Sequence, residues 1–157
     1  MVILNDFNTS VKRALEEIDP LYESYNGLVV CGTHNQQNVE EMVGILKTAR
    51  ENKTPTLLIC AGYQLGAIEY AQNVLGIKDA TSEEFGEGTF VVIKRPELKI
   101  GLHEGESWWS NYEVDPQIDA LWVRPKEWVC VPYHPEYQSS KDNPHKDLLK
   151  FISLCKK

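Results

Sequence analysis

The sequence lacks the two features that mark exported and membrane-spanning proteins. No continuous apolar run approaches the roughly 20 residues that a membrane-spanning helix needs. The N-terminal stretch MVILNDFNTSVKRALEEI has no basic start before a long apolar segment. We therefore expect neither a signal peptide nor a membrane anchor.

Positive charge is also scarce. The chain has 16 Lys and Arg against 23 Asp and Glu, which gives a net charge of -7. Proteins that bind nucleic acids or anionic membranes need a basic face, so the composition disfavours both classes. Docking onto a basic patch of a partner protein is compatible with this charge.

Paired cysteine motifs are missing as well. The four cysteines stand far apart, at positions 31, 60, 130 and 155, and none belongs to a CxxC pair. In a chain without an export signal such cysteines are expected to be reduced thiols, which predicts a cytoplasmic protein. Buried cysteines commonly just fill a small apolar space, so a chemical role for any of the four needs further support.

Motifs for cofactors and metals are not found in the sequence. There is no GxxxxGK[ST] loop to hold phosphates. His34, His103 and His145 are scattered, without the spacing of metal ligands. We therefore predict neither a cofactor nor a metal site.

What the first half of the chain does have is an alternation of short apolar runs and amphipathic segments, which is typical of an α/β protein. The predicted strands are residues 2–6, 27–32 and 54–60, and the predicted helices are residues 9–18, 38–53 and 63–76. Strand 27–32 is apolar throughout, as expected when helices cover both faces of a parallel sheet. Asn38 stands at a helix N-cap position, three residues before Glu41.

The pattern changes after residue 86. Residues 88–105 are predicted to form a hairpin around RPEL, and residues 119–133 a second strand pair that turns at PKE. A last helix is predicted from Asn143 as N-cap, with Pro144 at its first position, to Cys155. No repeat or linker divides the sequence, so residues 1–157 are predicted to form one domain. Its predicted fold is a flavodoxin-like three-layer α/β sandwich, with a mostly parallel central sheet, helices on both faces and an antiparallel annex.

Three candidate chemical groups follow predicted strands. They are Gly32 in CGTHN, Cys60 in LICAGYQ and His134 in YHPEY, where Glu136 follows two residues later. Ligands of parallel sheets bind at the carboxyl ends of the strands. A thiolate is stabilised where a strand runs into a helix, because free N–H groups and the helix dipole lie there. A thiol, a histidine that takes its proton and a carboxylate that orients the imidazole form a cysteine acyl-transfer site.

Several of these stretches together resemble the class I, triad-type glutamine amidotransferase family, and within it the glutaminase domains of CTP synthases. The family's G-I-C-x-G-x-Q elbow is similar to LICAGYQ at residues 58–64, and its F-H-P-E-F box to YHPEY. Residues 67–85, AIEYAQNVLGIKDATSEEF, and residues 109–116, WSNYEVDP, also resemble that family. The resemblance covers roughly residues 27–155 and does not include a synthetase domain.

The resemblance implies a catalytic triad of Cys60, His134 and Glu136. Cys60 would attack the side-chain amide of glutamine to form a thioester and release ammonia, and His134, oriented by Glu136, would act as base and then acid. The implied role is a glutaminase that supplies ammonia to a separate synthetase partner, in nucleotide metabolism.

The same resemblance implies residues that hold the substrate. Backbone N–H groups of Ala61 and of the loop at Gly32 and Thr33 would bind the oxyanion. Glutamine would be bound by side chains at four positions. These are Gln64, Glu84, Asn111 and Tyr112.

Two of these positions depart from the family pattern and leave two alternatives open. Thr33 stands where the family's P-G-G loop has its second glycine, and Asn111 stands where the family has an arginine. One alternative is hydrolysis of another γ-glutamyl compound or small amide. The other is a catalytically degenerate module that binds or regulates.

Overall fold

The computed structural model describes residues 1–33, 35–94, 101–102, 108–109 and 112–157, with the backbone alone at residues 101–102 and 108–109. Its main sheet has four parallel strands in the order β1-β2-β3-β9. These strands are β1 (Val2–Leu4), β2 (Leu28–Val30), β3 (Thr56–Ile59) and β9 (Trp128–Val131). The predicted parallel sheet is confirmed, and residues 128–131 extend it.

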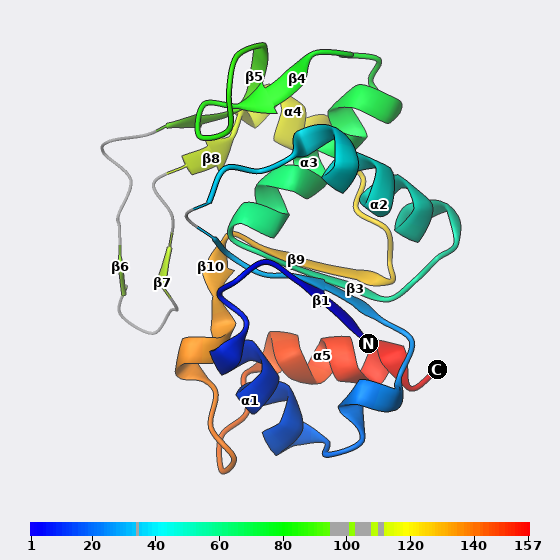
Figure 1. Ribbon diagram of the computed structural model, residues 1–157, viewed down its shortest axis with the longest axis vertical. Helices are drawn as coiled ribbons and strands as arrows, with labels where there is room; N and C mark the ends of the chain where they lie inside the picture. The colour runs from blue at the N-terminus through cyan, green and yellow to red at the C-terminus, as the bar shows by residue number, and fades with distance from the viewer. Residues whose placement is uncertain (34, 95–100, 103–107, 110–111) are drawn as a thin grey trace.

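Helices cover both faces of this sheet (Figure 1). On one side lie α2 (Val39–Glu51) and α3 (Ala61–Asn73), and on the other lie α1 (Thr9–Ile18) and α5 (Lys146–Cys155). A short 3-10 helix, η1 (Tyr22–Ser24), links α1 to β2. The three-layer α/β arrangement predicted from the sequence is therefore present.

The sheet separates two hydrophobic cores, and alternate residues of each strand point into one or the other. Val30 and Leu58 pack with α2 and α3, whereas Val29 and Leu57 pack with α1 and α5. Since both faces are covered, an apolar residue is required at every position of β2 and β3. This explains their uninterrupted apolar runs.

Two small sheets replace the predicted annex. One has the order β4-β5-β8 and pairs its strands both parallel and antiparallel, and the other has the order β10-β7-β6 and is antiparallel. Their strands are β4 (Ala80–Ser82), β5 (Thr89–Lys94), β8 (Tyr112–Val114), β6 (Gly101–Leu102), β7 (Trp108–Trp109) and β10 (Tyr133–His134).

The two predicted hairpins are wrong. β5 pairs with β4 and β8, while β6 pairs with β7 in the other sheet, and the expected turn at RPEL lies outside the described residues. The second predicted strand pair covers residues 119–133, but helix α4 (Pro116–Leu121) occupies the start of that range. Asp115 caps this helix by accepting a hydrogen bond from the N–H of Gln117, and Pro116 occupies its first turn.

The predicted helix starts have mixed outcomes. Asn38 caps α2 as expected, since its side chain accepts a hydrogen bond from the N–H of Glu41. The last helix begins later than predicted, because its N-cap is His145, which accepts from the N–H of Asp147. The prediction of Asn143 as its cap is therefore wrong.

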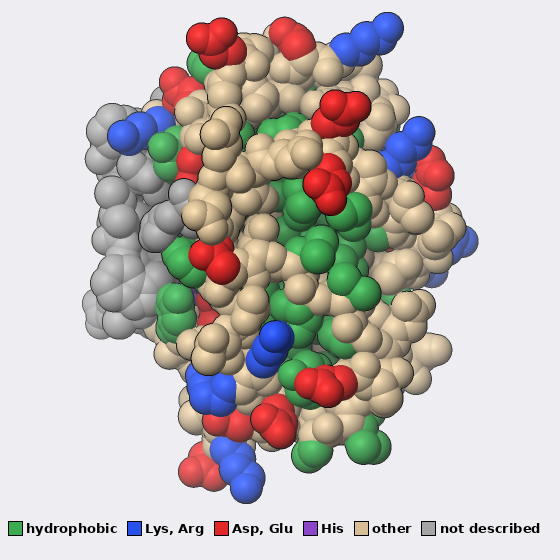
Figure 2. Space-filling model, viewed as in Figure 1, with side chains coloured by type: hydrophobic (Ala, Val, Ile, Leu, Met, Phe, Trp, Pro, Cys, Tyr) green, Lys and Arg blue, Asp and Glu red, His purple; other side chains and the backbone are tan. Residues whose placement is uncertain are grey.

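The surface carries charges of both signs. On the face shown in Figure 2, acidic and basic side chains are interspersed around a hydrophobic patch near the middle. Within the part of the chain that the structure describes, every helix is too short or too polar to cross a membrane.

Candidate active site

The carboxyl ends of the parallel strands meet at one edge of the main sheet. Gly32 follows β2, Cys60 follows β3 directly, and His134 comes shortly after β9. The three groups that the sequence places at strand ends therefore share one edge, as expected from the parallel order.

Cys60 occupies a sharp turn between β3 and α3. Its backbone has φ 53° and ψ -104°, a conformation that a residue with a side chain rarely adopts. The turn directs a partly exposed thiol to the edge of the sheet, at the N-terminus of α3. Strained strand-to-helix turns of this kind present the nucleophile in α/β-hydrolase folds.

Gly62 makes this turn possible. A β-carbon at this position would lie 2.3 Å from the carbonyl oxygen of Val30, far inside van der Waals contact. Glycine is therefore required for the first turn of α3 to pack against β2, which explains the glycine of the LICAGYQ stretch.

His134 connects Cys60 to a buried carboxylate. Its Nδ1–H donates a hydrogen bond of 2.6 Å to Oε1 of Glu136, which is completely buried. The side chain of Cys60 also hydrogen-bonds with the imidazole and contributes to its raised pKa. Burial lowers the pKa of His134, but the hydrogen bonds and charges of Cys60 and Glu136 raise it, and the net result is a pKa of about 9.

The imidazole is enclosed on two further sides. The ring of Tyr137 stacks on it, with 5.2 Å between the centroids and 24° between the planes. A β-carbon at Gly32 would lie 2.7 Å from Cε1 of His134. The imidazole thus has one position, between Gly32 and Tyr137, in which it reaches both Cys60 and Glu136.

The other three cysteines have a different environment. Burial raises the pKa of the Cys31 and Cys130 thiols to about 12 and that of Cys155 to about 11. These thiols remain protonated at neutral pH. Of the four, Cys60 is the cysteine that pairs with a histidine.

Three of the predicted glutamine-binding residues, Gln64, Glu84 and Tyr112, lie near one another by the first turns of α3. The buried side chain of Gln64 donates to Oε2 of Glu84 at 2.7 Å and accepts from the hydroxyl of Ser82 at 2.7 Å. The carboxylates of Glu83 and Glu84 contribute to a raised pKa of Tyr112, after burial as the main cause. Asn111 lies outside the described residues.

The predicted oxyanion residues lie on both sides of Cys60. Ala61 begins α3 and is buried, so its N–H is one of those at the helix N-terminus without an intrahelical acceptor. Gly32 and the buried Thr33 follow β2. Among the non-glycine residues that the structure describes, positive φ angles occur at Asn5, Lys53 and Cys60. Thr33 therefore has a negative φ angle, which a β-branched residue adopts without strain.

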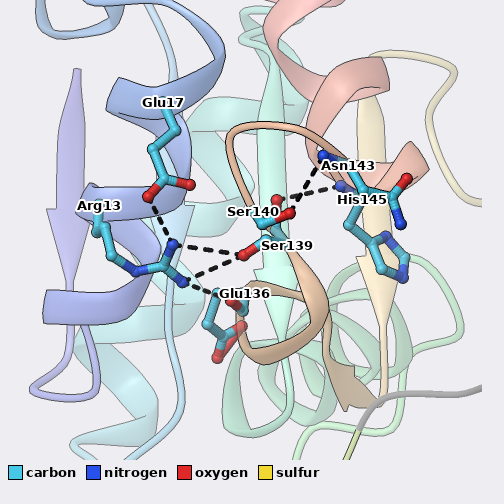
Figure 3. Close-up of polar contacts among 7 residues, drawn as sticks. All are labelled: Arg13, Glu17, Glu136, Ser139, Ser140, Asn143 and His145. Carbon is cyan, nitrogen blue, oxygen red and sulfur yellow. Dashed lines mark hydrogen bonds and ion pairs between the residues drawn. The ribbon is translucent and has the colours of Figure 1, made fainter.

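Three residues of this site were missed by the sequence analysis. Ser82 and Tyr137 lie within the motifs SEEF and YHPEY, so both could have been found there. Arg13 of α1 carried no such signal. It donates hydrogen bonds to the backbone carbonyls of Glu136 and Ser139, on the turn that carries Glu136 (Figure 3).

A metal site is not assembled by the described part of the chain, where no three His, Cys, Asp or Glu side chains group as metal ligands. The chemistry available at this edge is that of a thiol, an imidazole and a carboxylate, which is suited to covalent attack on a carbonyl carbon.

A comparison of the sequence with models of known protein families identifies the family of this chain. A family model described as glutamine amidotransferase class-I matches residues 2–122. The chain belongs to the class I glutamine amidotransferase family. The matched range includes Cys60, Gln64 and Glu84 and ends before His134.

Curated relatives of this amidotransferase chain include CTP synthases. Those of Methanoculleus marisnigri and Methanospirillum hungatei are 31% and 36% identical to it over 180 and 192 positions, covering 84% and 90% of this chain. The chain spans about a third of their length, 34% and 36%. Since 180 aligned positions correspond to 84% of a 157-residue chain, the relatives carry insertions that this amidotransferase lacks.

A solved structure has the same fold. The glutaminase domain of Trypanosoma brucei CTPS with bound acivicin superposes with a TM-score of 0.72 at 18% identity. The match covers 97% of this amidotransferase chain and 89% of that domain. At this identity the likeness establishes the α/β fold.

Proposed function

We propose that residues 1–157 form a glutaminase domain that hydrolyses the side-chain amide of glutamine through Cys60, His134 and Glu136. The observation that supports this most directly is the contact of His134 with both Cys60 and Glu136, at a strained strand-to-helix turn. A structural cysteine has no need of a left-handed backbone or of a histidine ordered by a buried carboxylate.

In the proposed reaction the sulfur of Cys60 attacks the amide carbon of glutamine. The negative oxygen that forms accepts hydrogen bonds from the N–H of Ala61 and from the loop at Gly32 and Thr33, donors of a kind worth about 2.7–4 kcal/mol each. His134 takes the proton of the thiol and gives it to the departing nitrogen, so that the C–N bond breaks, ammonia leaves and a thioester remains. His134 then takes a proton from water, whose oxygen attacks the thioester, and returns it to the sulfur as the C–S bond breaks, which releases glutamate and restores the thiol.

Glu84 is the proposed partner for the α-ammonium group of glutamine. Its carboxylate is half-buried and held by Gln64, which is fixed in turn by Ser82. A negative group held in this way favours a cation through a charge-assisted hydrogen bond. Asn111 and Tyr112 are proposed to contact the rest of the substrate.

We also propose that the ammonia is handed to a separate synthetase partner, in nucleotide metabolism. The support is the similarity to CTP synthases, whose remaining two thirds are not represented in this chain. A cytoplasmic location goes with this proposal and stays a prediction.

A second substrate class is favoured by one position of the sequence. Asn111 is uncharged, whereas an arginine is expected there from the family pattern, and an uncharged side chain binds a free carboxylate less strongly. γ-Glutamyl compounds and other small amides are therefore the alternative substrates. A binding module without catalysis is the alternative to all hydrolysis.

The test is glutamate formation from glutamine by the full chain, alone and with a candidate synthetase. We expect Cys60→Ala to abolish turnover, because the nucleophile is lost. The matched control is Cys155→Ala, which removes a thiol distant from the edge of the sheet and is expected to leave the rate unchanged. Parallel assays with γ-glutamyl derivatives separate the two substrate classes.

Labelling tests the nucleophile independently of turnover. A chloromethyl-ketone analogue of glutamine is expected to add one equivalent to the wild type and to Cys155→Ala, but none to Cys60→Ala, as read by intact mass. Wild-type protein that neither turns over any of these amides nor reacts with the analogue would support the binding module and refute the enzyme.

A further inference from the structure

We infer that Arg13 is a positioning residue for the proposed hydrolysis: from α1 it fixes the turn that holds Glu136 and Tyr137 against the catalytic imidazole. The inference rests on the proposed function and extends it to a helix that carries none of the reacting groups. It concerns the geometry of His134 and is therefore measurable with or without turnover.

The turn in question is η2 (Pro135–Gln138), which directly follows His134. It carries both side chains that hold the imidazole from this side, namely Glu136 through the 2.6 Å hydrogen bond and Tyr137 through stacking. Any shift of this short helix moves both contacts at once. The orientation of His134 therefore depends on how firmly η2 is held.

The carboxylate of Glu136 has few contacts that fix its orientation. Its Oε1 accepts the hydrogen bond from His134, whereas its Oε2 is buried and has no hydrogen-bond partner among the described residues. A carboxylate with one anchored oxygen can turn about that bond. The position of the backbone at Glu136 must therefore set the direction of the side chain.

Arg13 supplies the backbone anchor (Figure 3). Its Nη2 donates to the carbonyl oxygen of Glu136 at 3.0 Å, and both Nη1 and Nη2 lie 3.4 Å from the carbonyl oxygen of Ser139. The planar guanidinium thus binds two carbonyls one turn apart, which a lysine cannot do with equal geometry. Glu17, one turn along α1, accepts a hydrogen bond from Nη1 at 2.9 Å, separately from the two carbonyl contacts.

The segment after η2 has its own anchor at α5. The hydroxyl of Ser139 accepts a hydrogen bond from the N–H of His145, and Ser140 and Asn143 close a turn between them (Figure 3). Within the described contacts, Arg13 is what binds the carbonyl of Glu136 itself. Loss of Arg13 is therefore expected to loosen η2 while the loop stays attached to α5.

Several charged or titratable groups face His134 and Glu136 and must be held constant in a test. Cys60 and Tyr137 contact the ring directly, and the charge of Glu136 acts on Tyr137 and on two further groups, Cys31 and His145. None of these is altered by a change at Arg13. A change in the titration of His134 after substitution of Arg13 then reports on the geometry of the hydrogen bond to Glu136 or on the guanidinium itself.

The experiment compares Arg13→Ala, Arg13→Lys and Glu17→Gln with the wild type in the full chain. The titration of His134 is followed by NMR of ¹⁵N-labelled histidine, with its signal assigned by its loss in His134→Gln, and kcat and KM for glutamine are measured on the same samples. Circular dichroism establishes that each variant is folded. In Arg13→Ala we expect kcat to fall between about tenfold and a hundredfold, as for a misplaced catalytic group, with KM within about twofold.

The expected titration changes separate positioning from simple charge. Removal of a nearby cation alone would raise the pKa of His134, whereas a loosened Glu136 lowers it, so a lower pKa in Arg13→Ala supports the inference. Arg13→Lys keeps the charge but binds one carbonyl at a time. Its kcat and its His134 pKa are expected to lie between those of the wild type and those of Arg13→Ala. Glu17→Gln leaves both carbonyl contacts and is expected to behave as wild type.

Three results would overturn the inference. One is an unchanged or raised His134 pKa in Arg13→Ala together with unchanged kcat. Another is an Arg13→Ala variant that has full activity and differs from the wild type only in its free energy of unfolding. The third is an equal loss of kcat in Arg13→Ala and Glu17→Gln, which would mean that both substitutions act by disturbing helix α1 as a whole. If wild-type protein has no turnover, the proposed function fails, and the titration alone still decides the role of Arg13.

Discussion

Cys60 combines a reactive position with an unfavourable backbone. A non-glycine residue in a sparsely populated region of φ and ψ costs of the order of 1–3 kcal/mol, and Cys60 lies at φ 53° and ψ -104°. The surrounding β3 and α3 hold it there, with its N–H bonded to the carbonyl of Val131 at 3.0 Å. The thiol is thus presented at the expense of stability.

This strain predicts a difference in stability between two variants at Cys60. Cys60→Gly removes the side chain that opposes a positive φ, whereas Cys60→Ala keeps the β-carbon, so the glycine variant is expected to be more stable by about 1 kcal/mol or more. The free energy of unfolding in urea measures the difference. Equal stability of the two variants would show that the backbone at Cys60 is relaxed.

The pKa of His134 predicts the pH dependence of turnover. In the proposed reaction a protonated His134 gives its proton to the departing ammonia, so kcat/KM for glutamate formation is expected to fall as the pH rises through about 9. Glu136→Gln removes the negative charge that stabilises the imidazolium, which lowers the pKa of His134. The alkaline limb is then expected at lower pH.

The control for this measurement is Glu87→Gln, which removes an exposed carboxylate away from His134 and is expected to leave the alkaline limb in place. An alkaline limb that stays at the same pH in Glu136→Gln would mean that another group titrates there.

At the scale of helices and strands, glycines show which helix packs closely on the sheet. A β-carbon at Gly62 in α3 would lie 2.3 Å from the carbonyl oxygen of Val30, whereas one at Gly44 in α2 would meet nothing within 4 Å. Both residues are inside helices. They differ in whether the helix touches the strand at that point.

These two glycines form a matched pair for a stability test. Gly62→Ala is expected to destabilise the fold by about 1–3 kcal/mol, because the helix must move away from β2. Gly44→Ala is expected to stabilise it by about 0.4–1 kcal/mol, because alanine restricts the unfolded chain and favours a helix. Urea unfolding measures both values. A stabilising effect of Gly62→Ala would contradict the close packing.

Local signals located α1, α2, α3 and α5 and most of the parallel strands. The segments at α1, α2 and α3 have apolar residues at helical spacing, and Asn38 capped α2 as predicted. The segment before β9 was taken for a strand although Asp115 and Pro116 form a helix start that the sequence displays. Strand pairing was the weaker part, because alternation predicts a strand in 88–94 but carries no information about its partner.

At the scale of the whole molecule, the site exists because four parallel strands end at one edge of the sheet. Residues that are far apart in the sequence, such as Cys60 and His134, meet there without any local signal for their distance. Glu136 is completely buried there, and away from water its hydrogen bond with His134 is strengthened.

The sequence by itself determined the family, the candidate groups, which lie in short stretches such as LICAGYQ and YHPEY, and the α/β class, which follows from the alternation of apolar and amphipathic segments. Only the tertiary structure decided which strands pair with β5 and β9, and that Arg13 binds a turn 123 positions further along the chain. The physical reason is that periodicity and capping act within a few residues. Contacts between distant segments depend on how the layers pack, which no local pattern records.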